Sequence, residues 1–121
     1  MTKRILVVED TEDNRQIMRD LLSSAGYDLV EAVDGAEGVA MAKSQRPDLI
    51  LMDIQLPVLD GYEATRRIKA DPALSHIPVI AVTSYALSGD EAKTRDAGCD
   101  GYMAKPFSPR QLLQKVREYL P

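Results

Sequence analysis

The stretch Leu-Ile-Leu-Met-Asp at residues 49–53 has four apolar side chains followed by one acid, Asp53. Similar short apolar runs occupy residues 5–8 and 79–82. Runs that are short and apolar throughout indicate strands buried on both faces of a sheet. Weaker strand candidates are residues 28–32 and 101–104.

The segments between these runs have the spacing of amphipathic helices. One predicted apolar face joins Ile17, Met18, Leu21, Leu22 and Ala25, and another joins Leu112, Leu113, Val116, Tyr119 and Leu120. Four predicted helix starts place a capping residue three positions before Glu or Gln, at Asp34, Asp60, Ser88 and Ser108. Gly26 and Gly98 fit the ends of helices. Strand and helix therefore alternate five times.

This alternation predicts an α/β protein with a parallel sheet that is covered by helices on both faces. Right-handed crossovers leave few possible topologies. For five strands we expect the doubly wound, flavodoxin-like sheet with strand order 2-1-3-4-5. Nothing in the sequence marks a linker or an internal repeat, so we expect one domain over residues 1–121.

Composition excludes several classes of function. The chain of 121 residues carries a net charge of −4 and its basic residues are scattered, which disfavours nucleic-acid binding. No apolar run approaches the roughly 20 residues of a membrane span, and the run at residues 5–8 is too short for a signal peptide. A single cysteine, Cys99, rules out an internal disulfide and fits a reducing compartment. We therefore expect a cytoplasmic protein with no membrane partner.

Polar residues follow the predicted strands at their carboxyl ends, which meet at one edge of a parallel sheet. They are Glu9 and Asp10 after the first strand, Asp53 after the third, Thr83 and Ser84 after the fourth, and Lys105 after the fifth. Three carboxylates at one edge repel one another unless some protonate or a cation joins them. Mg²⁺ is the expected cation, because it binds carboxylate oxygens and retains several waters.

A cation, a lysine and a hydroxyl around one carboxylate suit the transfer of a phosphoryl group to that carboxylate. Such transfer depends mainly on positioning and on charge neutralisation. An aspartate can act as the nucleophile and carry the group covalently. These residues alone leave three rivals open: a phosphatase or phosphotransferase of the haloacid-dehalogenase type, a flavodoxin-type cofactor carrier, and a scaffold that is never phosphorylated.

Across its whole length the sequence resembles the response-regulator receiver family, whose members are CheY-like. The stretches that carry the resemblance are residues 5–10, 47–57, 60–61, 82–84 and 97–106. It looks closest to single-domain regulators of the cell-division type. The alternative is a receiver domain excised from a hybrid sensor kinase or a larger regulator.

The resemblance implies a phosphoacceptor site. Asp53 would accept a phosphoryl group from a phosphohistidine. Asp10, Asp53 and the backbone carbonyl of Gln55 would hold Mg²⁺, with Glu9 assisting through water. Lys105 would pair with the phosphoryl group, and its peptide bond to Pro106 would be cis.

The resemblance also implies a switch. Thr83 would hydrogen-bond the phosphoryl group, and Tyr102 would turn inward when Thr83 moves. Side chains at Gln55 and Tyr85 would tune the lifetime of the phosphoryl group. The face built from the fourth helix, the fifth strand and the fifth helix would then bind a protein target.

In this interpretation the chain is a phosphoacceptor switch and not an enzyme acting on a separate substrate, although it catalyses its own phosphotransfer and slow dephosphorylation. Its partners would be a histidine kinase or a histidine phosphotransfer protein and a downstream protein target. The haloacid-dehalogenase alternative fits less well, because those enzymes usually carry a second acid where this chain has Gln55. The flavodoxin alternative is disfavoured by the acidic loop at residues 10–14, which lacks a phosphate cradle.

Overall fold

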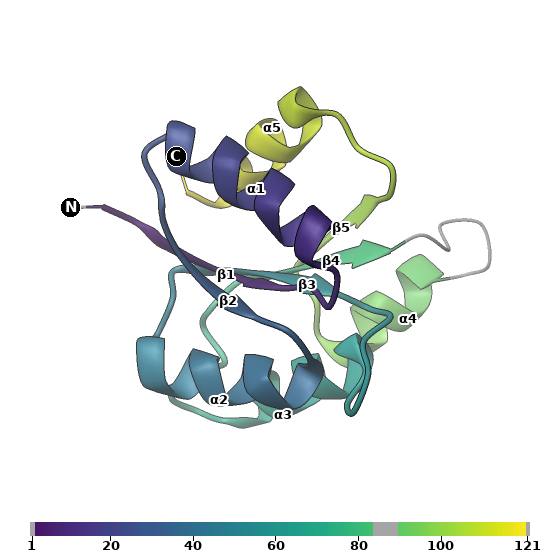
Figure 1. The fold of residues 1–121 in the computed structure, drawn as a ribbon. Coiled ribbons are helices and arrows are strands. Elements are labelled where there is room, and N and C mark those ends of the chain that lie inside the picture. The colour runs from purple at the N-terminus through teal and green to yellow at the C-terminus, as the bar shows by residue number, and fades with distance from the viewer. Residues whose placement is uncertain (1, 84–89, 121) are drawn as a thin grey trace.

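The computed structural model describes residues 2–83 and 90–120, and within them five strands alternate with five helices (Figure 1). The strands are β1 (Arg4–Val8), β2 (Asp28–Ala32), β3 (Leu49–Asp53), β4 (Val79–Thr83) and β5 (Gly101–Ala104). The helices are α1 (Glu12–Ser24), α2 (Gly35–Gln45), α3 (Gly61–Ala70), α4 (Asp90–Ala97) and α5 (Pro109–Tyr119). None of these helices is long and apolar enough to cross a bilayer.

The five strands form one parallel sheet in the order β2-β1-β3-β4-β5, which confirms the predicted topology. The register pairs Val8 with Met52, so the chain segments that follow β1 and β3 leave the sheet side by side. Asp53 pairs with Val82 on the other side, one residue before the end of β4. The register thus brings the polar ends of three strands to one edge.

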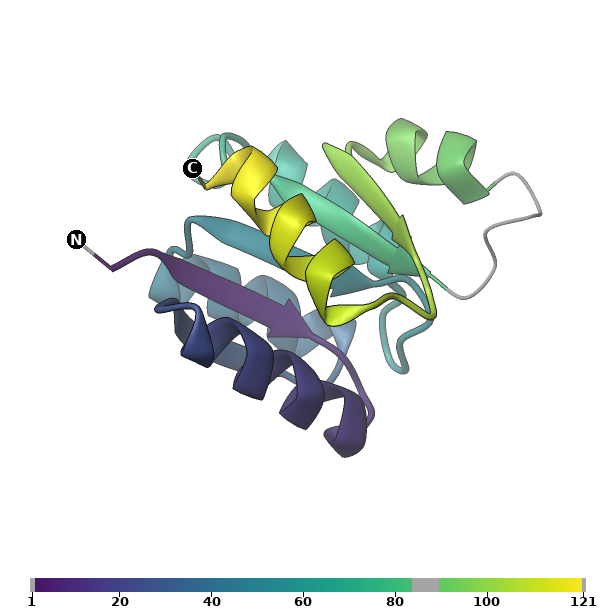
Figure 2. The same cartoon turned by 90° about the horizontal axis from the view of Figure 1, so that it is seen from above.

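The helices cover both faces of the sheet. Helices α1 and α5 lie side by side over one face, and α2, α3 and α4 lie under the other (Figures 1 and 2). Successive strand residues point to opposite faces, so each strand contributes to two cores. Ile5 and Val7 pack with α1 and α5, whereas Leu6 and Val8 pack with α2 and α3.

The helix starts follow the predicted capping pattern. The Asp34 and Asp60 carboxylates accept backbone N–H bonds from the residues three positions later, at 2.7 and 2.9 Å. Ser108 and Gln111 form a reciprocal capping box at the start of α5. The predicted cap Ser88 lies outside the described residues. Gly26 and Gly98 adopt positive φ angles of 94° and 103° just beyond helices, as expected for helix ends.

The predicted apolar face of α1 is wrong at two positions. Met18 and Leu22 are buried against the sheet, but Ile17 is 54% exposed and Ala25 is also exposed. Residue 17 lies about 100° around the helix from residue 18. When Met18 faces the sheet, the Ile17 side chain therefore points beyond the edge of the contact between α1 and the sheet. On α5 the predicted face is confirmed at Leu112, Val116 and Leu120, all buried.

Helix α4 buries few of its described side chains. Its buried residues are Thr94 and Ala97, whereas Ala92 is exposed. The buried Thr94 hydroxyl has a hydrogen-bond partner, because it donates to the Glu91 carbonyl at 2.8 Å. A helix anchored by two small side chains is expected to be the most easily displaced element of the fold.

Candidate functional site

The carboxyl edge of β1 and β3 carries three acids in close contact. Glu9 and Asp10 follow β1 directly, and Asp53 is the last residue of β3. One carboxylate oxygen from each lies within 4.8 Å of the others. Glu9 and Asp53 are buried, with 2% and 5% of their surface exposed, and Asp10 is exposed. The structure therefore brings together the acids that the sequence placed at this edge.

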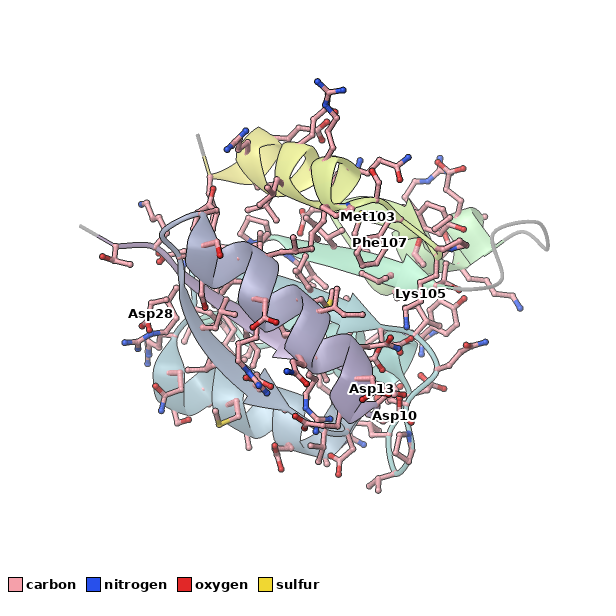
Figure 3. All side chains as sticks on the ribbon, turned by 45° about the horizontal axis from the view of Figure 1, so that its top comes forward. Asp10, Asp13, Asp28, Met103, Lys105 and Phe107 are labelled. Atoms are coloured by element: carbon pink, nitrogen blue, oxygen red, sulfur yellow. The ribbon has the colours of Figure 1, made fainter. Side chains whose placement is uncertain are left out.

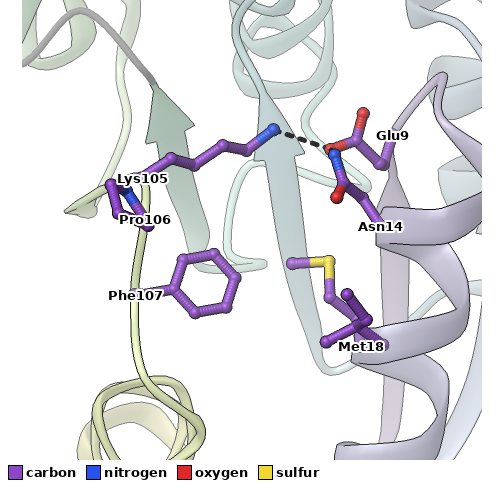
Figure 4. Close-up of a pocket in the computed structure, with 7 residues that line it drawn as sticks. Glu9, Asn14, Met18, Lys105, Pro106 and Phe107 are labelled. Carbon is purple, nitrogen blue, oxygen red and sulfur yellow. Dashed lines mark hydrogen bonds and ion pairs between the residues drawn. The ribbon is translucent and has the colours of Figure 1, made fainter.

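Lys105 reaches into this acid cluster from the segment that follows β5. Its Nζ donates to Glu9 Oε1 at 2.7 Å (Figure 4). It also donates to Asp53 Oδ2 at 3.1 Å. The peptide bond between Lys105 and Pro106 is cis. Figure 3 shows Lys105 and Asp10 near the same edge of the molecule, far from Asp28 at the opposite edge.

The two buried acids differ in their affinity for a proton. Burial, and after it the neighbouring Glu9, together raise the pKa of Asp53 to about 6, against the opposing effects of the Gln55 N–H and of Lys105. Burial also disfavours ionised Glu9, but hydrogen bonds from Lys105 and its acidic neighbours lower the pKa of Glu9 to about 2. Burial alone would lower the pKa of Lys105. The interactions with Glu9 and Asp53 outweigh burial, so the pKa of Lys105 is raised overall. Glu9 and Lys105 thus form the stable ion pair, and Asp53 holds a proton more tightly than an ordinary aspartate does.

Thr83 and Tyr102, the two residues of the predicted switch, lie on the neighbouring strands β4 and β5. Thr83 is fully buried at the end of β4, one position beyond the residue that pairs with Asp53. Its carbonyl accepts the Lys105 N–H at 2.7 Å, so the backbones that carry these two side chains are joined. Tyr102 is half-buried in β5 and lines two hollows, of about 350 and 280 Å³, on the face of α4, β5 and α5.

The residues proposed to tune the phosphoryl lifetime are only partly described. The Gln55 N–H donates to Asp53 Oδ1 at 3.0 Å, which places this backbone directly against the acid, and the Gln55 side chain is exposed. Tyr85 and the Ser84 hydroxyl lie outside the described residues.

Three further side chains of α1 belong to the site and were not predicted. Asn14 Nδ2 donates to Glu9 Oε1 at 3.1 Å, and Arg15 donates to the Glu9 carbonyl at 2.8 Å. Ile17 lines a groove of about 430 Å³. Met18 and Phe107 line the same groove (Figure 4). A signal for Asn14 and Arg15 was present in the sequence, because the first turn of a helix that follows a strand directly must lie beside that strand's end.

The acid cluster fits a divalent cation. It offers three carboxylates whose hard oxygen atoms Mg²⁺ prefers, and one of them is exposed to solvent that could complete the coordination. Mg²⁺ needs only one or two carboxylates when a phosphate supplies further oxygens. Lys105 supplies one positive charge against three acids, so a second cation would neutralise much of the remaining charge.

Parallel strands in the order 2-1-3-4-5, with acids after β1 and β3 and a lysine after β5, define a receiver-type α/β domain. The family model described as the response regulator receiver domain matches residues 5–117, and the chain belongs to that family. It is a receiver domain of two-component signalling.

The chain is also similar to named proteins of known class. It is 45% identical over 120 residues to the polar-differentiation response regulator DivK of Brucella ovis, covering 99% of this chain and 98% of the relative. This similarity to a single-domain regulator supports that class over the receiver of a hybrid kinase.

Solved structures show the same fold. The receiver domain of the sensor histidine kinase PA1611 from Pseudomonas aeruginosa, solved with a magnesium ion in its active-site cleft, is 41% identical with a TM-score of 0.92. The match covers 99% of this chain and 98% of that one. The chemotaxis protein CheY4 of Vibrio cholerae is 28% identical with a TM-score of 0.93, over 98% and 99% of the two chains.

Proposed function

We propose that residues 1–121 act as one phosphoacceptor domain in which Asp53 takes a phosphoryl group from a phosphohistidine. The observation that carries this proposal is the position of Lys105, whose Nζ bridges buried Glu9 and buried Asp53. A lysine held against a carboxylate at the edge of a sheet is placed to neutralise charge that arrives on that carboxylate.

In the proposed reaction an Asp53 oxygen forms a new bond to phosphorus as the bond from phosphorus to the donor imidazole nitrogen breaks. The electron pair of the broken bond stays on the imidazole, which takes a proton from solvent. Lys105 would follow the incoming phosphoryl oxygens from its position 3.1 Å from Asp53, and the buried Thr83 hydroxyl would donate to them. Asp10, Asp53 and the Gln55 carbonyl would hold Mg²⁺, assisted by Glu9, and the ion would neutralise charge on the phosphoryl group.

The same residues would support slow loss of the phosphoryl group. The exposed Gln55 side chain, two positions beyond the acceptor, would border the path of an attacking water, as would the side chain of Tyr85. The domain would thus catalyse its own phosphorylation and dephosphorylation without acting on a separate substrate.

The phosphodonor would be a histidine kinase or a histidine phosphotransfer protein in the cytoplasm. The apolar groove lined by Ile17, Met18 and Phe107 opens beside Lys105 and offers such a donor a contact surface next to the acceptor. The downstream target would be a protein that reads the face of α4, β5 and α5.

The experiment that tests the function is incubation of the protein with acetyl phosphate and Mg²⁺, followed by measurement of its intact mass. We expect a gain of one phosphoryl group, which is lost when Mg²⁺ is removed with EDTA before the incubation. A protein whose mass never changes under these conditions would contradict the proposal.

Substitution of Asp10 should weaken Mg²⁺ binding more than substitution of Glu9. Asp10 is exposed and has no ion pair among the described residues, so its oxygens are available to a cation. Glu9 is already occupied by Lys105. By calorimetry we expect Glu9→Ala to lower Mg²⁺ affinity about tenfold and Asp10→Ala to lower it beyond detection. Equal affinity of Asp10→Ala and the parent would refute the metal role.

Tyr102 should carry the signal from the acceptor to the surface. Two charge-assisted hydrogen bonds from Lys105 and Thr83 would together supply roughly 3–6 kcal/mol before desolvation and ordering costs, and a full switch needs about 5.5 kcal/mol. The shift should therefore be partial, and a partner that prefers the active form would complete it. With the phosphate mimic beryllofluoride, we expect amide chemical shifts of the parent to move throughout β5 and α5. In Tyr102→Ala they should move only near Asp53, and Tyr102→Phe should behave as the parent. Full-range shifts in Tyr102→Ala would exclude this route.

A further inference from the structure

We propose that Asn14 and Arg15 are positioning residues that hold Glu9 in the place where it restrains Lys105 and joins the acid cluster. Among the described residues, the hydrogen bonds of Asn14 and Arg15 reach Glu9 and not Asp53, so both would act through Glu9. The effect on phosphoryl transfer rests on the proposed function, but the positioning of Glu9 does not.

Every polar group of Glu9 has a partner. Its Oε1 accepts both Lys105 Nζ at 2.7 Å and Asn14 Nδ2 at 3.1 Å, and its Oε2 accepts the Thr11 N–H at 3.3 Å. Its carbonyl accepts the Arg15 guanidinium, and its N–H donates to the Ala32 carbonyl at 3.0 Å. Since Glu9 is only 2% exposed, water cannot easily replace any of these partners.

Asn14 restrains the Glu9 oxygen that also binds Lys105. Glu9 Oε1 is the atom that binds Lys105, and the amide of Asn14 approaches the same oxygen from α1 (Figure 4). A glutamate has one more rotatable bond than an aspartate, so its carboxylate reaches farther and is less restrained by the backbone. The Asn14 amide supplies the restraint that the longer side chain needs.

Arg15 fixes the backbone of the same residue. Its side chain is 11% exposed, and its guanidinium pairs with Glu12 and with Glu31 of β2, the latter at 3.4 Å. From this position it donates to the Glu9 carbonyl at 2.8 Å. Arg15 thereby ties the turn that carries Glu9 and Asp10 to both α1 and β2.

Arg19 provides a matched control within the same charge network. It pairs with Glu31 at 2.7 Å and with Glu12 at 3.4 Å, the two acids that also bracket Arg15. None of its hydrogen bonds to described residues reaches Glu9. A loss caused only by a weakened network should therefore be the same for Arg15 and for Arg19.

The location of Asn14 couples the acid cluster to the groove. Asn14 lines the groove together with Ile17, Met18 and Phe107, and it also bonds to Glu9. A side chain that entered the groove would contact the residue that holds Glu9 on Lys105.

The test begins with the ion-free protein labelled with ¹³C at glutamate carboxyls. In Asn14→Ala the Glu9 carboxyl resonance should shift and broaden, because one of the two donors to Oε1 is lost. Calorimetry should then show Mg²⁺ affinity lowered about fivefold in Asn14→Ala and in Arg15→Met, and changed less than twofold in Arg19→Met. If Arg15→Met fails to fold, Arg15→Lys replaces it, with the same expected direction.

A double-mutant cycle decides whether Asn14 acts through Glu9. In a Glu9→Ala background, Asn14→Ala should cause no further loss of Mg²⁺ affinity. The inference is overturned if the fivefold loss persists in that background, if the Glu9 resonance is unchanged in Asn14→Ala, or if Arg19→Met matches Arg15→Met. A parent protein that takes up neither Mg²⁺ nor a phosphoryl group would refute the proposed function, and the Glu9 resonance would still test the inference.

Discussion

The Asp53→Asn protein should gain no phosphoryl group from acetyl phosphate and Mg²⁺ under conditions that label the parent completely. An asparagine amide has no carboxylate oxygen to attack phosphorus, although its shape preserves the surroundings of Lys105. The rate should fall by about 10³-fold or more, as expected when the nucleophile of a covalent step is removed. Intact-mass spectrometry over a time course measures this directly.

The neighbouring acids should not take over the role of Asp53. Glu9 is held by Lys105 and Asn14 through the same oxygen. Asp13→Asn is a suitable control, because Asp13 is an exposed acid near the same edge (Figure 3) with no ion pair among the described residues. It should be labelled like the parent. Labelling of Asp53→Asn at the parental rate would show that another residue is the acceptor.

Much of this fold could be predicted from sequence because its signals are local. A run such as residues 79–82 is apolar whatever its neighbours, and a cap such as Asp60 bonds to a residue three positions later. Alternation of these signals then leaves few topologies. The carboxyl ends of parallel strands meet at one edge of the sheet, so the clustering of the acids at these ends could be predicted in the same way.

The rest depends on contacts that the sequence does not record. Whether Ile17 packs or lines a groove is decided by how α1 lies against Phe107, a residue 90 positions away. The burial of Glu9 depends likewise on Lys105, which approaches from the far end of the chain. Side-chain partners across such separations follow from tertiary placement and not from periodicity.

The acid cluster places more negative charge around Asp53 than the single positive charge of Lys105 neutralises. Asp53 is buried beside Glu9, whose negative charge is secured by Lys105, so Asp53 shares a cation that is already engaged. The free energy of unfolding of such a domain should be lowest when Asp53 is ionised and no second cation is present. That condition yields a prediction about stability.

The Asp53→Asn protein should be more stable than the parent at pH 7 when divalent cations are absent. Asp53 has a pKa of about 6 in the folded chain against an ordinary value of 3.8, so the folded chain holds this proton more tightly than the unfolded chain. The Asp53 contribution to stability is therefore complete below pH 3.8 and is lost as the pH rises through 6. At pH 7 the loss amounts to about 1–3 kcal/mol, which the substitution should recover.

The contribution of Glu9 to stability has the opposite pH dependence and must be separated from that of Asp53. Its pKa falls from 4.5 to about 2 on folding, so its contribution is present above pH 4.5 and is lost as the pH falls toward 2. Both proteins retain Glu9, and its contribution largely cancels when their free energies of unfolding are compared at each pH. The difference between the two proteins should therefore shrink toward zero between pH 7 and pH 4.

Urea denaturation in EDTA at pH 7 and pH 4, repeated with saturating Mg²⁺ at pH 7, measures these free energies. A cation that binds only the folded state stabilises it by about 2.7 kcal/mol at 100 times its Kd. Because Asp53→Asn has lost a proposed ligand, Mg²⁺ should stabilise the parent more and remove or reverse the ranking. Asp13→Asn should match the parent throughout. If Asp53→Asn were less stable than the parent in EDTA at pH 7, the ionised Asp53 would be a stabilising partner of Lys105 and not a destabilising charge.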